Sequence, residues 1–278
     1  MLEGQELLAD ITEKLRVDPN VRSVVLFGSR ARPAGAFGPD RWSDIDLHLI
    51  VDSPSRMVES GWASGLGTDL HLQVARRVPG GVGKITLLFG AGEATLILLP
   101  LWPLRAVRLG MKFGLPQRLR PIRLALNEMA TVLRAGYQFL KGEKQWGRFY
   151  AQVVTGMPGR RLDDAEAAKL AEAFLIEMHG LLARLGRGEL VEAQRMLHKH
   201  LMECNLALIE EARLRQGLVT FGSARRVESL LSLAELPRVK ISARLNQEEL
   251  RAAARQAHAG MIHIMAELVP AWKPPIDF

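Results

Sequence analysis

Hydrophobic residues recur along this chain with two different periods. Up to about residue 110, short apolar runs alternate with turn residues and predict strands at about 22–27, 44–51, 69–75, 83–89 and 93–99. An amphipathic helix is predicted before them at 4–16, and helical spacing returns afterwards at 118–141, 144–155, 163–185, 189–216, 223–232 and 246–268. The pattern therefore predicts an α/β domain, a mixed sheet with flanking helices, followed by an all-α helical-bundle domain.

Glycine and proline mark the predicted division between the two parts. Pro103, Gly110, Gly114, Pro116 and Pro121 interrupt the segment between the last strand and the first long helix. We therefore place the domains at 1–110 and 111–278. The helices of the second domain have clear start signals, with Asp163 before one of them and Asn246 before another.

The most informative segment is the pair of strands at 22–27 and 44–51. Asp44 and Asp46 are two residues apart, so in a strand they point to one face, while Ile45 and Leu47 point to the other. Two adjacent carboxylates repel unless a cation lies between them. Mg²⁺ prefers oxygen ligands and is commonly held by one or two carboxylates together with substrate phosphates. Asp44 and Asp46 are therefore predicted metal ligands.

A small-residue turn follows the first of these strands. Gly28 has no Cβ and lets a phosphate approach the backbone, and Ser29 adds a hydroxyl at the start of the next segment. The alternative interpretation is an ordinary turn before an acidic strand at the protein surface. The order of apolar strand, Gly-Ser turn and Asp-x-Asp strand favours binding of a metal-bound phosphate compound.

These residues resemble a known family. Phe27-Gly28-Ser29-Arg30-Ala31-Arg32 together with Ser43-Asp44-Ile45-Asp46-Leu47 is similar to the core motif of the polymerase-β-type nucleotidyltransferase superfamily. The likeness is close over 22–51 and loose over roughly the first 108 residues. The length and the helical second half also resemble the small adenylyltransferases that modify aminoglycoside or lincosamide antibiotics. The resemblance implies an enzyme that uses ATP or another nucleoside triphosphate with Mg²⁺, in which two ions are expected.

The family places a third carboxylate on a later strand, and Glu93 is the candidate. It precedes an apolar run through Pro100, and the resemblance implies that it acts as a general base on the acceptor hydroxyl. The alternative is that Glu93 only begins the strand in solvent after a glycine turn. A shift of one position in the strand would place Thr95 at the site instead, and a catalytically impaired relative would result.

Basic residues near the motif and in the second domain are further candidates for binding the triphosphate. Arg30 follows the phosphate turn, although an ion pair with Asp40 or Asp52 is an equal alternative. Lys199 shares a helix face with Arg195, and basic residues of the second domain bind the phosphates in relatives. Cofactor-binding residues are thus predicted to be Gly28, Ser29, Arg30 and Lys199.

Charge and composition limit the remaining alternatives. Residues 1–110 contain 12 basic and 12 acidic residues, whereas 111–278 contain 25 and 18, so the formal charge of +7 lies in the second part. This excess would attract a triphosphate and also RNA. The single Cys204, the absence of a signal peptide and the absence of an apolar span predict a cytoplasmic protein without a membrane partner.

The predicted function is transfer of a nucleoside monophosphate, AMP from ATP, to a hydroxyl of a small acceptor such as an aminoglycoside or lincosamide. Two alternatives stay open. One is a nucleotidyltransferase that acts on tRNA or on a protein of a toxin-antitoxin pair, and the other is a non-catalytic nucleotide-binding relative. The acceptor, the base preference and the oligomeric state are left open by the sequence, with a homodimer among the alternatives.

Overall fold

A computed structural model describes residues 3–32, 38–59, 61–66, 70–78, 82–114, 118–159, 161–220, 222, 224–276 and 278. The chain divides into two compact units, Met1–Arg160 and Arg161–Phe278. Each unit is described by itself.

The first unit is built on a mixed six-stranded sheet with the strand order β3-β4-β5-β2-β1-β6. Strands β2 and β5 run parallel, and the other neighbours pair antiparallel. The strands are β1 (Val21–Phe27), β2 (Ile45–Val51), β3 (Leu70–Val78), β4 (Val82–Phe89), β5 (Gly92–Pro100) and β6 (Tyr137–Lys141). The five strands predicted from period-two alternation correspond to β1 through β5, which confirms the mixed sheet.

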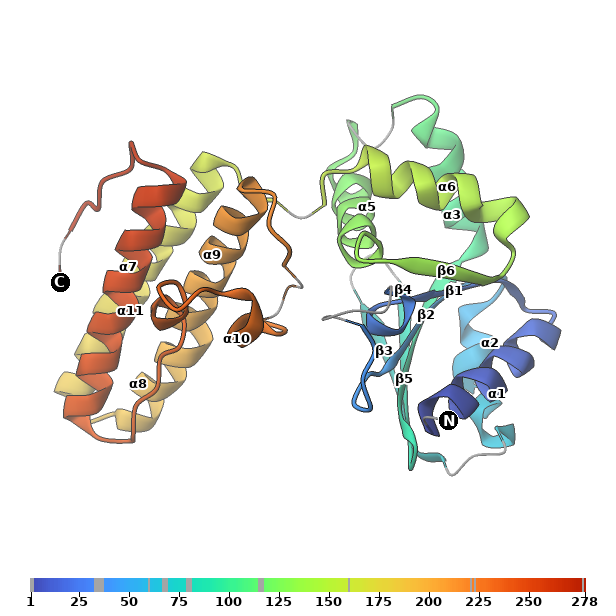
Figure 1. The fold of residues 1–278 in the computed structure, drawn as a ribbon, viewed down its shortest axis with the longest axis horizontal. Helices are drawn as coiled ribbons and strands as arrows, with labels where there is room; N and C mark the ends of the chain where they lie inside the picture. Colours follow the sequence, from blue (N-terminus) through green and yellow to red (C-terminus); the bar gives the residue numbers. More distant parts are fainter. Residues whose placement is uncertain are drawn as a thin grey trace. The chain divides into compact units, whose positions relative to one another are not determined.

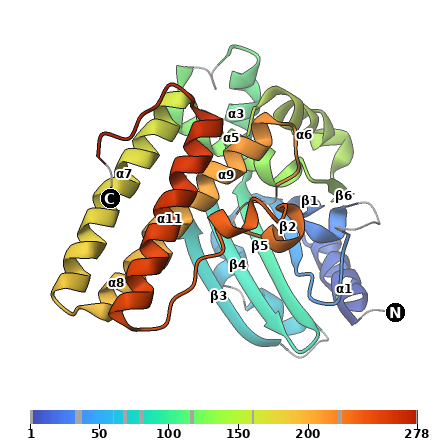
Figure 2. The same ribbon diagram turned by 60° about the vertical axis from the view of Figure 1, so that its left-hand side comes forward.

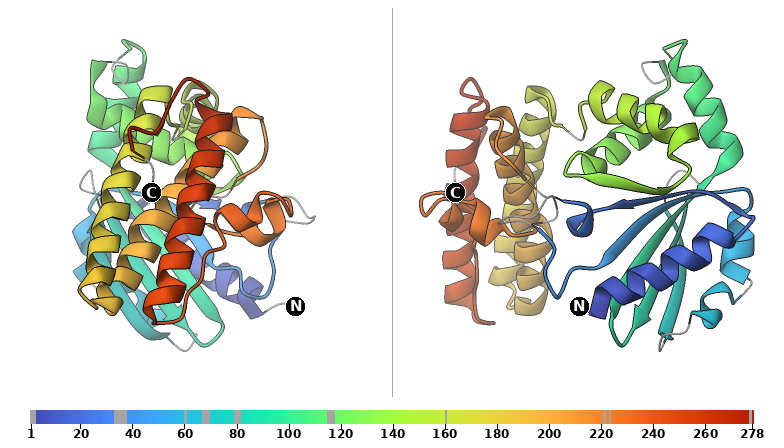
Figure 3. Two further views of the ribbon diagram at one scale, coloured as in Figure 1. Left: turned by 90° about the vertical axis from the view of Figure 1, so that its left-hand side faces the viewer. Right: turned by 45° about the vertical axis from the view of Figure 1, so that its right-hand side comes forward.

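Helices cover both faces of this sheet, as Figure 1 shows. Helix α1 (Glu3–Val17), the short α2 (Pro54–Glu59) and the 3-10 turn η2 (Trp62–Gly65) lie on one face, where Leu47, Leu96 and Ile11 share a buried core. Helices α3 (Leu101–Met111), α5 (Arg120–Leu133) and α6 (Glu143–Gly156) lie on the other face. The right-hand view of Figure 3 shows the sheet between these two layers.

The predicted helix at 118–141 is wrong in its second half. Helix α5 ends at Leu133 and the chain then forms β6, which pairs with β1. Gly136 explains the break, because its φ is +135° and a Cβ there would lie 2.7 Å from the carbonyl oxygen of Ala31. Only glycine lets the chain pass so close to the turn that follows β1.

The compact units also divide later than the predicted boundary near residue 110. Residues after 110 remain in the first unit because β6 completes the sheet and α5 and α6 pack on it. Trp146, Phe149 and Tyr150 of α6 share a buried core with Val25 and Phe27 of β1. Pro103 and Gly110 lie within α3 and Pro121 in the first turn of α5, whereas Gly114 is in the turn after α3. Pro116 lies outside the described residues.

The second unit is all-helical, so the predicted order of an α/β part followed by a helical part is confirmed. Figure 2 shows its long helices packed side by side. Its elements are α7 (Asp164–Gly186), α8 (Leu190–Met196), the π-helical segment η3 (Leu197–Met202), α9 (Glu203–Arg215), α10 (Val227–Leu230), the 3-10 turn η4 (Leu236–Arg238) and α11 (Gln247–Leu268). Asp163 and Asn246 cap α7 and α11 as the sequence predicts, since each side chain accepts a backbone N–H of the first turn.

A buried ion pair network joins the start of this unit to α9. Glu211 is 3% exposed and accepts hydrogen bonds from Arg161, from Arg215 and from the backbone N–H of Leu162. Burial by itself would raise the pKa of Glu211, but these hydrogen bonds outweigh burial and lower the pKa below its usual value.

We expect Glu211→Gln to lower the free energy of unfolding by about 3 kcal/mol near neutral pH, because two arginines would lose their buried partner. The wild-type contribution is fully present above the unfolded-state pKa of about 4.3 and is lost as the pH falls through the lower folded-state value. Urea unfolding at several pH values measures this. Glu192→Gln, which removes an exposed ion pair with Arg195, is the matched control and should leave stability nearly unchanged. Equal midpoints for the wild type and Glu211→Gln at neutral pH would contradict the assignment.

No helix in the described part of the chain is both long and apolar enough to cross a membrane.

Candidate active site

The parallel pairing of β2 with β5 brings the predicted acidic residues to one face of the sheet. Asp46 is the second residue of β2, and its partner in the register is Thr95 of β5. Residues paired in this way point to the same side, and alternation puts Glu93 on the side of Thr95. Asp44 lies two residues before Asp46, just before β2 begins.

Glu93 and Thr95 also contact each other directly. The Thr95 hydroxyl donates to Glu93 Oε1 at 3.5 Å, which is a long hydrogen bond. Thr95 is buried, whereas Glu93 is exposed at the start of β5. In the observed register Thr95 is the direct partner of Asp46, and Glu93 lies on the same side of β5 two residues earlier. The exposure of Glu93 agrees with the alternative that it begins the strand in solvent. The roles of Glu93, Asp44 and Asp46 in catalysis stay predictions.

Gly28 lies directly against Asp46. Its φ is +76°, and a Cβ at this position would lie 2.5 Å from Asp46 Oδ2. Antiparallel pairing of Phe27 with Asp46 produces this close approach. The glycine is thus required both by its own backbone conformation and by the carboxylate beside it.

We expect Gly28→Ala to lower the free energy of unfolding by about 1–3 kcal/mol through backbone strain, and to reduce transfer further by displacing the Asp46 carboxylate. Thermal unfolding and turnover measured on the same sample separate the two effects. Gly186→Ala is the control, since a Cβ there meets nothing within 4 Å. Wild-type turnover by Gly28→Ala would show that the close approach to Asp46 is not needed.

Ser29 begins the 3-10 turn η1 (Ser29–Ala31) after Gly28. Its hydroxyl oxygen is buried and has no hydrogen-bond partner among the residues that the structure describes. Buried polar atoms are nearly always bonded, so this hydroxyl is free to bond to water or to a bound phosphate. This observation fits the predicted phosphate-binding role.

Arg30 has a different set of contacts from those predicted. Its Nε and Nη2 donate to the carbonyl oxygen of Ser43 at 3.0 and 2.7 Å, and Nε also donates to that of Asp44 at 3.2 Å. The guanidinium therefore fastens the turn after β1 to the residues that lead into β2. The alternative ion pair with Asp52 is wrong, because Asp52 pairs with Arg22. A contact of Arg30 with the triphosphate stays a prediction.

Sequence reasoning missed His48, a buried polar residue two positions after Asp46 in β2. His48 is on the same face of β2 as Asp46, is 4% exposed, and lies between the rings of Phe27 and Tyr150 at centroid distances of 4.3 and 6.2 Å. Burial lowers the pKa of His48 to about 3, so the imidazole is neutral. The signal available in the sequence was the position of His48 two residues after Asp46, which puts both side chains on the same face of a strand. Asp46 and His48 are thus successive polar residues on one face of β2, and both are buried.

The donor set fits magnesium. Within the described residues, no three His, Cys, Asp or Glu side chains converge on one metal position. Asp44 and Asp46 would supply carboxylate oxygens, and water and substrate phosphates supply the remaining ligands in sites of this kind. Binding of such phosphates by the Gly28 backbone and the Ser29 hydroxyl stays a prediction.

Lys199 belongs to the second unit. It lies in η3, and it is exposed. Arg195, predicted to act with it, pairs with Glu192. Because Lys199 and the aspartates belong to separate units, its binding of the triphosphate stays a prediction.

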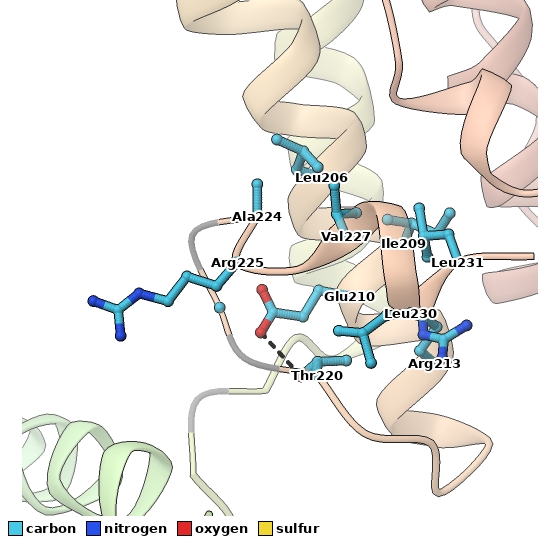
Figure 4. Close-up of a pocket in the computed structure, with 11 residues that line it drawn as sticks. Leu206, Ile209, Glu210, Arg213, Thr220, Ala224, Arg225, Val227, Leu230 and Leu231 are labelled. Carbon is cyan, nitrogen blue, oxygen red and sulfur yellow. Dashed lines mark hydrogen bonds between the residues drawn. The ribbon is translucent and has the colours of Figure 1, made fainter. Parts of the chain in front are cut away.

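The second unit also has a small hollow, shown in Figure 4, which is lined by residues of α9 and of the segment that leads into and through α10. Glu210 accepts a hydrogen bond from Thr220 inside it at 3.2 Å. The hollow is open to solvent and has a volume of about 40 Å³. Ligand pockets usually measure about 300–1,000 Å³, so this hollow is too small for a nucleotide or an antibiotic.

Comparison with known proteins agrees with the sequence resemblance. Residues 1–82 match the family model of streptomycin adenylyltransferase. This segment contains Gly28, Ser29, Asp44 and Asp46 but ends before Glu93. The match confirms the predicted resemblance to nucleotidyltransferases of the antibiotic-adenylyltransferase type and the predicted enzyme class.

Two solved structures are loosely similar. One is an aminoglycoside 6-adenyltransferase from Bacillus subtilis, with a TM-score of 0.41 and 12% identity over 98% of this chain and 92% of that chain. The other is a nucleotidyltransferase-like protein from Exiguobacterium sibiricum, with a TM-score of 0.34 and 11% identity over 95% of this chain and 76% of that chain. A search of curated protein sequences gave no significant match.

Proposed function

We propose that this chain is a Mg²⁺-dependent adenylyltransferase that transfers AMP from ATP to a hydroxyl of a small acceptor, an aminoglycoside or a lincosamide. The observation that carries the proposal is the sheet face shared by Asp46, Thr95 and Glu93, with Gly28 packed against Asp46. The family match over residues 1–82 supports the reaction class.

Each residue has a distinct role in this proposal. Asp44 and Asp46 hold the metal, which when bound neutralises charge on the triphosphate and on the departing pyrophosphate. Gly28 and Ser29 bind the β and γ phosphates. Arg30 keeps the turn in place against the start of β2 through its bonds to the carbonyl oxygens of Ser43 and Asp44.

Glu93 acts on the acceptor. Its carboxylate takes the proton of the acceptor hydroxyl, the acceptor oxygen forms a bond to the α phosphorus, and the bond from that phosphorus to the pyrophosphate oxygen breaks. The hydrogen bond from Thr95 holds Glu93 on the side of Asp46.

A screen for pyrophosphate release tests the proposal. Purified protein is incubated with each nucleoside triphosphate and a panel of aminoglycosides and lincosamides, with Mg²⁺ or with EDTA. We expect release only with one of these acceptors, with ATP preferred and with no release in EDTA. Label from α-labelled ATP that appears in tRNA or in protein, and in none of the antibiotics, would favour the macromolecular alternative instead.

A further inference from the structure

Helix α3 exposes large apolar side chains on its outer face. Trp102 is 73% exposed, Leu109 58%, and Phe113, just after the helix, 71%. Residues seven apart return to nearly the same side of an α-helix, so Trp102 and Leu109 form one stripe, and Phe113 follows it in the turn after α3. The opposite side of α3, with Leu104 and Val107, packs on the core of the first unit. We call the exposed side the α3 stripe.

The same stretch of chain is basic throughout. Residues 101–127 contain no aspartate or glutamate and six basic residues, namely Arg105, Arg108, Lys112, Arg118, Arg120 and Arg123. In the described part of the chain, none of these six forms an ion pair. Two further exposed leucines, Leu119 and Leu124, lie among them.

The division into two units also changes the part of the protein to which the net charge is assigned. Residues 111–160 contain nine basic and two acidic residues, whereas 161–278 contain 16 of each. The whole formal excess of +7 therefore belongs to the first unit and not to the helical unit. Among the described residues, cations outside any ion pair lie beside exposed apolar side chains, and this combination fits a partner that is both anionic and apolar.

We infer that the α3 stripe and the basic segment that follows it dock on an anionic lipid surface. Interfacial helices of this kind bury Trp, Phe and Leu at the level of the lipid headgroups while Lys and Arg contact anionic headgroups. Arg105 lies over the Trp102 ring at 5.5 Å, which keeps the cation beside the apolar stripe. This partner differs from the sequence expectation of no membrane, which rested on the absence of an apolar span long enough to cross a bilayer.

Other occupants fit these observations less well. RNA would use stacking on aromatic rings, but Leu109, Leu119 and Leu124 have none, the Trp102 ring already has Arg105 over it, and Phe113 is the one remaining exposed ring among the apolar residues named here. A second copy of the chain would bring two basic stripes together without acidic partners, which is unfavourable.

Vesicle sedimentation with the full-length protein tests this inference. We expect binding to phosphatidylcholine vesicles with about a third phosphatidylglycerol, little binding to pure phosphatidylcholine, and weaker binding as salt rises above about 0.1 M. Trp102→Ser with Leu109→Ser should abolish binding. Lys112→Gln with Arg123→Gln should weaken it by about fivefold for each cation removed.

Matched variants in the helical unit are the controls. Ile176→Ser with Val191→Ser removes two side chains that are 72% and 70% exposed, and Lys240→Gln with Arg255→Gln removes two exposed cations outside any ion pair of the described residues. Both should bind vesicles like the wild type. Circular dichroism confirms that each variant is folded.

Several results would overturn the inference. They are equal binding to neutral and anionic vesicles, or no binding to either. Binding of tRNA that depends on the α3 stripe, in the absence of vesicle binding, would assign the surface to RNA. Self-association that Trp102→Ser with Leu109→Ser removes would assign it to a second copy. Adenylyl transfer by the stripe variants should remain at the wild-type level, so loss of vesicle binding and loss of the proposed activity are distinguishable.

Discussion

Asp46→Asn is expected to reduce adenylyl transfer by at least about 100-fold while the protein remains folded. The substitution keeps the size of the side chain beside Gly28 but removes the charge that is proposed to hold the metal. Turnover at saturating Mg²⁺ and ATP, together with thermal unfolding, measures both parts of this expectation. Asp44→Asn should behave in the same way.

Asp52→Asn is the matched control for this prediction. Asp52 follows the other end of β2 and pairs with Arg22 at the surface. Its loss should leave turnover unchanged. If Asp46→Asn turned over like the wild type in Mg²⁺, the metal assignment would be wrong.

Glu93→Gln is expected to lower kcat by about 10² to 10⁴ with nearly unchanged affinity for ATP, since it removes proton abstraction alone. Stopped-flow or steady-state kinetics give kcat, and calorimetric titration gives the Kd for ATP. Thr95→Val removes only the hydrogen bond to Glu93, so its kcat should fall less.

Two results would contradict the role of Glu93 as the general base. A Glu93→Gln variant with unchanged kcat would mean that another group takes the proton. A variant with a weakened ATP Kd and unchanged kcat would move Glu93 to nucleotide binding.

The strands of the site were predictable because their physical causes are local. Alternation of Ile45, Leu47 and Leu49 with polar residues defines the apolar face of β2 and thus the common side of Asp44 and Asp46. The position of Glu93 relative to Asp46 depends on how β5 pairs with β2. These strands are far apart in the sequence, so the local pattern of residues does not predict their register. The structure supplies it through the pairing of Asp46 with Thr95.

The remaining differences also come from long-range packing. In the sequence, the residues of β6 look like the end of the preceding helix. Their strand pairing with β1, and the close approach of Gly136 to the backbone of Ala31, appear only in the folded chain. Arg30 bonds to carbonyl oxygens that only the fold brings near. The exposure of Trp102 and Phe113 could not be read from hydrophobicity, which is the same for a core residue and a surface residue.

The most direct test of the account is a crystal structure with Mg²⁺ and a non-hydrolysable ATP analogue. The account predicts metal bound by carboxylate oxygens of Asp44 and Asp46 at about 2.0–2.1 Å, with β and γ phosphates at Gly28 and Ser29. The carboxylate of Glu93 should lie on the same side, on the order of 4 to 8 Å from those of the aspartates. Nucleotide bound elsewhere, or Glu93 directed to the opposite face of the sheet, would contradict it.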